Sequence, residues 1–135
     1  MQPSPPAWVD AWIGLPFALR GRGPGAYDCY GLVRAVLRER HGHDLPSWDE
    51  YDDLADVRAL RSVVEDARGR FEPVEFPEEG DAILLRSHGD PVHCGLVVAQ
   101  GWFLHTRRGI GSALERWTSP RWAARVEGFY RWRAA

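Results

Sequence analysis

Three side chains in this sequence have the chemistry for hydrolysis by a thiol: Cys29, His93 and His105. A cysteine reacts as its thiolate, and a helix N-terminus or a neighbouring imidazolium lowers the pKa of a thiol. Asp28 is a good helix N-cap, which would place Cys29 in a first helical turn. We therefore predict Cys29 as the nucleophile, His93 as its general base and His105 as the residue that orients the base.

The segment around Cys29 predicts a loop followed by a mostly buried helix. Residues 20–27 are rich in Gly and Pro, which permit turns closed to other residues. An apolar face then recurs at helical spacing from Leu32 to Leu37, and Gly42 is a suitable stop. The backbone N–H of Cys29, at the start of this helix, would contribute to an oxyanion hole.

Further helices and a set of strands complete the expected fold. Helical spacing indicates a short helix over residues 8–13 and a longer one that follows a capping box at 47–50 and runs to about Gly69. Strands are expected over residues 82–86, 92–99, 102–106, 112–116 and 126–132, with turns at 89–91 and 100–101. Helices followed by strands indicate an α+β fold with an antiparallel sheet, and 135 residues fit one domain over 1–135.

Whether His93 and His105 can meet depends on the turn between their strands. A two-residue turn at 100–101 pairs Leu96 with His105 and leaves the two histidines on opposite faces. A three- or five-residue loop sets them directly opposite each other on one face. Catalysis by this pair therefore requires an odd loop or a β-bulge, and the sequence leaves open which turn forms.

The second cysteine, Cys94, follows His93 directly in the same predicted strand. Successive side chains of a strand point to opposite faces. We therefore predict that Cys94 is a core residue and no disulfide partner of Cys29. A zinc site built from the two cysteines and the two histidines is disfavoured by this alternation and by the absence of Cys-x-x-Cys spacing. No metal or other cofactor is expected.

Several motifs resemble, in order, those of the NlpC-type cell-wall cysteine peptidases, a papain-like family. Residues 28–33 (Asp-Cys-Tyr-Gly-Leu-Val) are similar to its nucleophile motif, usually Asp-Cys-Ser-Gly-Leu-Val. Residues 93–98 are similar to its His-Val-Gly-Ile strand, and residues 103–105 to the segment with its third, polar catalytic residue. Residues 14–17 and 80–81 match its Gly-x-Pro-Tyr and Gly-Asp motifs, so the resemblance covers nearly the whole chain.

The resemblance implies a papain-like NlpC-type fold, in which the nucleophile helix packs on an antiparallel sheet that carries both histidines. It implies a peptidoglycan endopeptidase that cleaves cell-wall stem peptides, commonly between D-glutamate and the diamino acid. It also implies that Asp28 lines the substrate pocket as well as capping the helix. Phe17 stands where many members have Tyr, and Tyr30 replaces a Ser beside the nucleophile. These two departures bear on substrate preference more than on the chemistry.

Within the family, the Tyr30-containing motif, Leu45-Pro46 and the closing segment 128–131 look most like phage-tail members. The resemblance therefore implies a phage-tail or prophage-tail protein with other tail proteins as partners. The start of the sequence has no signal-peptide pattern, and no stretch is long enough to span a bilayer. We expect synthesis in the cytoplasm, no membrane insertion, and association with a virion or tail-like particle. A net charge of −2 gives no reason to expect nucleic acid as a partner.

Two other functions stay open at this point. One is a tail assembly protein with a vestigial site, in which Cys29 is a core residue, as a lone cysteine on an apolar helix usually is. The complete set of one cysteine and two histidines argues against it. The other is a papain-like amidase or acyltransferase acting on a different acyl substrate, which only substrates can separate from a wall peptidase.

Overall fold

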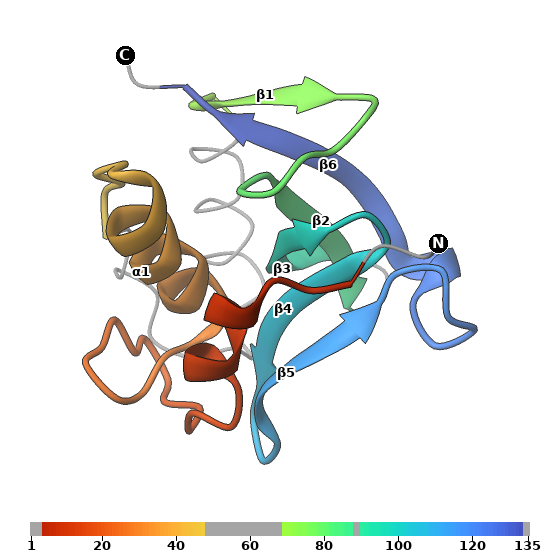
Figure 1. Cartoon of the computed structure of the whole chain (residues 1–135). Helices are drawn as coiled ribbons and strands as arrows, with labels where there is room; N and C mark the ends of the chain where they lie inside the picture. Colours follow the sequence, from red (N-terminus) through yellow and green to blue (C-terminus); the bar gives the residue numbers. More distant parts are fainter. Residues whose placement is uncertain (1–3, 48–68, 88–89, 134–135) are drawn as a thin grey trace.

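A helix lies across one face of an antiparallel sheet in the computed structural model, which describes residues 4–47, 69–87 and 90–133 (Figure 1). The elements of these ranges are η1 (Ala7–Trp12, a 3₁₀ helix), α1 (Cys29–His41), β1 (Phe71–Val74), β2 (Ala82–Ser87), β3 (Asp90–Ala99), β4 (Trp102–Arg107), β5 (Gly111–Arg116), η2 (Ala123–Arg125, also 3₁₀) and β6 (Val126–Trp132). The strands described form one sheet in the order β1-β6-β2-β3-β4-β5. None of the helices in these ranges is long and apolar enough to cross a membrane.

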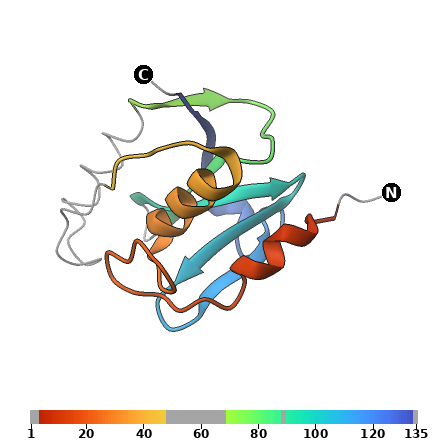
Figure 2. The same cartoon turned by 60° about the vertical axis from the view of Figure 1, so that its left-hand side comes forward.

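The predicted nucleophile helix is confirmed as α1, with the signals that the sequence provides at both ends. The Asp28 carboxylate accepts a hydrogen bond from the backbone N–H of Gly31 at 2.7 Å and so caps the first turn. At the other end Gly42 adopts a left-handed conformation, with φ of 70°. The buried face of α1, which includes Leu32 and Val36, packs on β3 and β4 (Figure 2).

Most strand predictions are confirmed, with two differences. β3 begins at Asp90, so part of the turn expected at 89–91 belongs to the strand. β1 was not predicted, because it is short and contains Pro73; it lies at one edge of the sheet, where a missing N–H is tolerated. The helix expected after the capping box at 47–50 falls outside the described residues.

The two faces of the sheet bury different clusters. On the α1 side, Leu96, Val98 and Leu104 join the main core. The other face carries a smaller cluster around Phe103 and Trp122. Because side chains alternate along β3 and β4, the odd-numbered residues near Phe103 point to this second face. Both predicted catalytic histidines lie on it.

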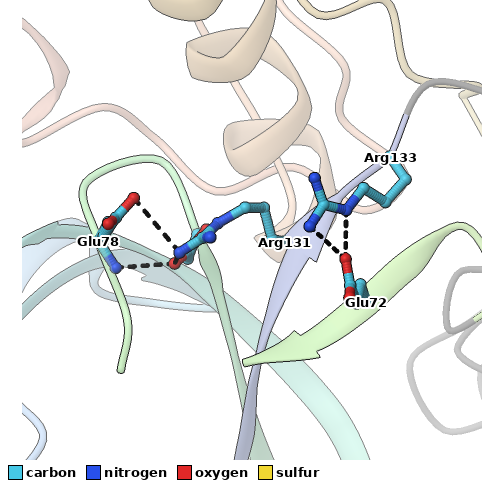
Figure 3. Close-up of polar contacts among 5 residues, drawn as sticks. Glu72, Glu78, Arg131 and Arg133 are labelled. Atoms are coloured by element: carbon cyan, nitrogen blue, oxygen red, sulfur yellow. Dashed lines mark hydrogen bonds and ion pairs between the residues drawn. The ribbon is translucent and has the colours of Figure 1, made fainter. Parts of the chain in front are cut away.

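The Gly-Asp motif at 80–81 has a structural explanation. Asp81 is buried and accepts hydrogen bonds from Arg131 Nε and Nη2, each at 2.9 Å, and from the backbone N–H of Glu78 at 2.7 Å. Arg131 also lies 3.3 Å from the Glu78 carboxylate (Figure 3). A two-pronged guanidinium–carboxylate pair of this kind fixes direction as well as distance. It ties the start of β2 to β6 and thereby sets the centre of the sheet.

A second ion pair in the same view, between Glu72 of β1 and Arg133, holds the edge strand to the end of β6 (Figure 3). β1 pairs with β6 through four consecutive residue pairs, from Phe71 with Trp132 to Val74 with Phe129. Ring packing adds to this contact, since Phe71 of β1 and Trp132 of β6 meet edge to face with ring centroids 5.2 Å apart. Strand pairing, the ion pair and the ring contact therefore hold β1 to β6. This edge of the sheet lies opposite the edge formed by β5.

Candidate active site

Glycines bring the loop at 20–27 against the first turn of α1 and so position Cys29. A Cβ atom on Gly31 would lie 1.8 Å from the Gly21 carbonyl oxygen, and one on Gly21 would lie 2.8 Å from the Ala18 oxygen. The backbone N–H of Asp28 donates to that Gly21 oxygen at 3.1 Å. The glycine of the Asp-Cys-x-Gly motif is therefore required by the close approach of two backbones.

Asp28, next to the nucleophile, is a buried carboxylate with one satisfied oxygen. Its Oδ1 accepts from Arg22 Nη1 at 2.7 Å as well as from the N–H of Gly31. Its Oδ2 is buried with no hydrogen-bond partner in the described part of the chain. Burial and the neighbouring Cys29 raise the pKa of Asp28 to about 6, although Arg22 opposes the shift.

The hairpin of β3 and β4 combines two of the alternatives left open by the sequence: a two-residue turn and a bulge. Ala99 pairs with Trp102 across the turn, the register then shifts, and Leu96 pairs with Leu104. The shift moves the rest of β3 by one residue and returns both histidines to one face. They are not directly opposite each other, because in this register His105 falls across from Gly95.

The two histidines are in hydrogen-bond contact along that diagonal. His93 Nε2 lies 2.9 Å from His105 Nδ1, and the rings meet edge to face with centroids 5.1 Å apart. The small residue between them allows this approach: a Cβ atom on Gly95 would lie 2.9 Å from the Leu104 oxygen and 3.2 Å from His105 Cβ. The glycine two places after His93 is therefore part of the geometry of the pair.

Glu115 on β5 extends the chain of contacts and was not predicted as a site residue. β5 pairs Ala113 with His105 and Glu115 with Phe103, which puts the Glu115 side chain on the face of the histidines. Its Oε2 lies 2.6 Å from His105 Nε2. The sequence marks Glu115 only as part of an expected strand, and the strand register, which brings it to His105, is a long-range property.

Trp122, in the segment before β6, covers the histidine pair and was also not predicted. Its ring stacks on His93 at 6.0 Å with an interplanar angle of 21°, and meets His105 edge to face at 5.0 Å. Trp122 is 2% exposed and His105 is 1% exposed. The bond between the histidines is therefore shielded from water, which strengthens it.

Cys94 packs against the main core, as predicted, but its contact with Cys29 was not predicted. Cys94 does face the α1 side, but a hydrogen bond from its thiol lowers the pKa of Cys29. Burial opposes that shift, and the hydrogen bond and positive charge of His93 add to it, so the Cys29 pKa falls well below its ordinary value. Strand alternation does not separate the two cysteines, because the Cys29 sulfur lies against the β3 backbone itself, where it also accepts from the Cys94 N–H.

The same contact and burial raise the pKa of Cys94 well above its ordinary value, in the direction opposite to that of Cys29. Both cysteines are free. Within the described ranges, no group of three or more His, Cys, Asp or Glu side chains is arranged to hold a metal ion.

The order of these motifs has a match among known proteins: the sequence fits the NlpC/P60 family model over residues 14–131. The chain belongs to the NlpC/P60 family. Protein P54 of Enterococcus faecium is 24% identical over 94 residues, which are 70% of this chain and 16% of that protein. The predicted family is confirmed.

Solved NlpC/P60 structures share the fold. A protein of Staphylococcus aureus described as similar to a lipoprotein of the NLP/P60 family has a TM-score of 0.65 and 23% identity, over 93% of this chain and 39% of that one. The NlpC/p60 domain of the peptidoglycan hydrolase SagA has a TM-score of 0.58 and 22% identity, over 93% and 92%. This chain thus spans less than half of the staphylococcal protein and nearly all of the SagA domain, and the NlpC-type α+β fold is confirmed.

Two NlpC/P60 positions that differ here, Tyr30 and Phe17, flank the nucleophile segment. The Tyr30 hydroxyl donates to the Pro46 carbonyl at 2.6 Å, and burial raises the pKa of this phenol. Phe17 pairs with Tyr27 in an isolated β-bridge, and the Arg108 guanidinium lies 6.0 Å from its ring. Both rings are therefore held beside residues 27–30 by contacts of their own.

We expect the stability of this NlpC/P60 domain to fall in acid through His105. Burial and the charge of His93 lower the pKa of His105 from 6.5 to about 4. Between these values the unfolded chain binds a proton that the folded domain does not, so stability decreases as the pH falls through this window. The loss between pH 7 and pH 4 is about 3 kcal/mol.

Urea unfolding of the wild type and of His105→Asn at several pH values measures this loss. The wild type should lose more stability than the variant, which has no group titrating at this position. Equal pH dependence of the two proteins would show that His105 does not carry it.

Proposed function

We propose that this NlpC/P60 chain is a cysteine peptidase that hydrolyses peptide bonds of peptidoglycan. Cys29 is the nucleophile, His93 its base and His105 the residue that orients the base. One observation carries the proposal: the thiol at the N-terminus of α1 contacts His93, whose Nε2 lies 2.9 Å from His105 Nδ1. Membership of the family and the likeness to the SagA domain, described as part of a peptidoglycan hydrolase, support it.

The geometry gives each group a step in the reaction. His93 takes the proton of Cys29, and the thiolate attacks the carbonyl carbon of the scissile bond. The backbone N–H of Cys29, at the helix start, donates to the oxyanion that forms. His93 then protonates the leaving amine, and a water molecule deprotonated by His93 hydrolyses the thioester and restores the thiol.

We propose stem peptides as the substrate, cleaved between D-glutamate and the diamino acid. We assign substrate binding to Asp28, Tyr30 and Phe17, which lie beside the nucleophile, although Asp28 itself is buried. The Arg22 guanidinium lies over the Tyr30 ring at 5.3 Å from its centre, and the Arg108 guanidinium lies over the Phe17 ring at 6.0 Å.

The same proposal includes the setting in which the enzyme acts: a phage tail or prophage tail, in contact with other tail proteins. It rests on the resemblance of the Tyr30-containing motif, of Leu45-Pro46 and of residues 128–131 to phage-tail members. An enzyme carried on a tail would open the wall locally at the point of attachment.

Mass spectrometry of defined stem peptides after incubation with the wild type and Cys29→Ala tests the activity. We expect fragments from the bond between D-glutamate and the diamino acid with the wild type, and none with Cys29→Ala. Thermal unfolding of both proteins confirms that the loss is chemical. Cleavage by Cys29→Ala would refute the nucleophile.

Folded wild type that leaves every wall peptide intact would contradict the peptidase proposal. Hydrolysis of another amide or ester by the same sample would then identify the amidase or acyltransferase alternative. A particle that carries Cys29→Ala and still assembles and infects normally would instead favour a structural role in the tail.

A further inference from the structure

We propose that Glu115 is a positioning residue that fixes the tautomers of His105 and His93 and so directs the basic nitrogen of His93 at Cys29. This inference deepens the proposed function and rests on it. It stands on two contacts in series: His105 Nε2 to Glu115 Oε2 at 2.6 Å and His93 Nε2 to His105 Nδ1 at 2.9 Å.

The first step concerns the His105–Glu115 contact. An ionised carboxylate only accepts hydrogen bonds, so His105 Nε2 must carry the proton. Glu115 remains ionised because its contacts with Trp122 and His105 outweigh burial and lower its pKa. Arg121 Nη1 lies 3.7 Å from Oε1, and the charge of Arg107 also favours the carboxylate.

The second step passes this assignment to His93. Burial keeps His105 neutral near pH 7, since its pKa is lowered to about 4. A neutral imidazole with a proton on Nε2 has a lone pair on Nδ1. His93 Nε2 must then be the donor of the 2.9 Å bond. Neutral His93 therefore keeps its lone pair on Nδ1, the nitrogen left to receive the Cys29 proton.

The other tautomer of His105 would disable the site. A proton on His105 Nδ1 would require a lone pair on His93 Nε2, so the proton of neutral His93 would sit on Nδ1. That nitrogen could then not act as a base toward Cys29. With Glu115 in place, His93 accepts the thiol proton without rotating, and the resulting imidazolium keeps an acceptor on each side: the thiolate and His105 Nδ1.

The histidine end of this chain of contacts is shielded from water. His105 is 1% exposed and Trp122 covers both imidazoles, whereas Glu115 reaches His105 from the edge strand β5 and is 22% exposed. Catalytic machinery in this chain thus extends across three adjacent strands, β3, β4 and β5.

Glu115→Gln and Glu72→Gln, made in the full chain, form a matched pair for the test. Both substitutions remove one negative charge from a strand glutamate, and Glu72 is ion-paired with Arg133 at the opposite edge of the sheet. Nitrogen-15 NMR of the imidazoles at pH 7 reports which ring nitrogen carries the proton. The rate of Cys29 alkylation by iodoacetamide against pH reports the thiolate.

In the wild type we expect His105 protonated on Nε2 and His93 on Nε2 or, as imidazolium, on both nitrogens. Glu115→Gln should give a mixture of His105 tautomers and slow Cys29 alkylation at pH 6 about tenfold. It should lower kcat on stem peptides about 10- to 100-fold with little change in KM. This is less than the roughly 10⁴-fold loss when a carboxylate in direct contact with a catalytic base is replaced. Glu72→Gln should match the wild type in every measurement.

A wild-type spectrum with the His105 proton on Nδ1 would overturn the inference without any variant. So would a folded Glu115→Gln with the wild-type tautomer and alkylation profile. If the wild type cuts no stem peptide, the proposed function fails, but the NMR and alkylation measurements still decide the role of Glu115, because neither needs a substrate.

Discussion

Replacing His93 with glutamine is expected to leave a folded protein whose hydrolysis of stem peptides is roughly 10³- to 10⁴-fold slower than that of the wild type. The variant loses the base that takes the Cys29 proton and the acid that protonates the leaving amine. It also loses the hydrogen bond and the positive charge that help to lower the pKa of Cys29. Steady-state kinetics on a defined stem peptide measures the first effect.

Alkylation of Cys29 by iodoacetamide, located by peptide mass spectrometry, measures the second effect. In the wild type the reaction should proceed in mildly acidic solution, where an ordinary thiol is protonated. In His93→Gln it should require a higher pH. His43→Gln is the matched control, because His43 stacks on His41 at the far end of α1. A His93→Gln variant with the wild-type rate and alkylation profile would mean that the base lies elsewhere.

Gly31→Ala is expected to destabilise the domain by roughly 3 kcal/mol or more. The added Cβ would fall 1.8 Å from the Gly21 carbonyl oxygen and 3.1 Å from Asp28 Oδ1. The Gly21 carbonyl belongs to a backbone that is itself in close contact with Ala18. Neither the loop nor the helix can therefore move away without a large loss of free energy. The helix start must move, and Cys29 moves with it, so activity should fall together with stability.

Urea unfolding monitored by tryptophan fluorescence gives the loss for Gly31→Ala, and Gly25→Ala provides the comparison. Gly25 has a positive φ of 86° but open space around its Cα, so a methyl group there carries only the conformational penalty, about 1 kcal/mol. Similar losses for the two variants would show that the contact between loop and helix is not tight. A much larger loss of stability for Gly31→Ala would confirm that the contact is tight.

The sequence predicts the helices and strands of this fold well where neighbouring residues determine where an element begins and ends. Asp28 and Gly42 bound α1 because a cap and a left-handed stop are local requirements. The strands from β2 to β6 follow from alternation and turn residues. β1 is different: four residues with Pro73 carry little strand signal, and they pair because β6 offers an edge and Arg133 offers a partner for Glu72.

The site could be predicted where the type of a single residue indicates its chemical role. Cys29, His93 and His105 combine reactive types with suitable elements, and the structure brings them into contact. The bulge between Ala99 and Val97, which gives the histidines a common face, could be stated only as a requirement. The role of Glu115 could not be predicted, because its contact with His105 depends on the register of β5 against β4.

The contact between Cys94 and Cys29 was not predicted, for a related reason. The side-chain alternation of β3 was applied correctly, and Cys94 does face α1. Alternation describes where side chains point, however, and does not say which residue of α1 lies over the face to which Cys94 points. Contacts with a backbone require the position of α1 along the sheet, which is set by tertiary packing.

Cys29 and His93, the proposed nucleophile and base, are far apart along the chain, whereas His93 and His105 lie on one hairpin. During synthesis Cys29 emerges long before either histidine, and in an unfolded chain it is an ordinary thiol without a helix terminus or an imidazole beside it. Chemical reactivity therefore arises only when the domain is complete, which protects an immature chain from oxidation and adduct formation. For the same reason, the fraction of Cys29 labelled in mild acid counts the molecules that have folded.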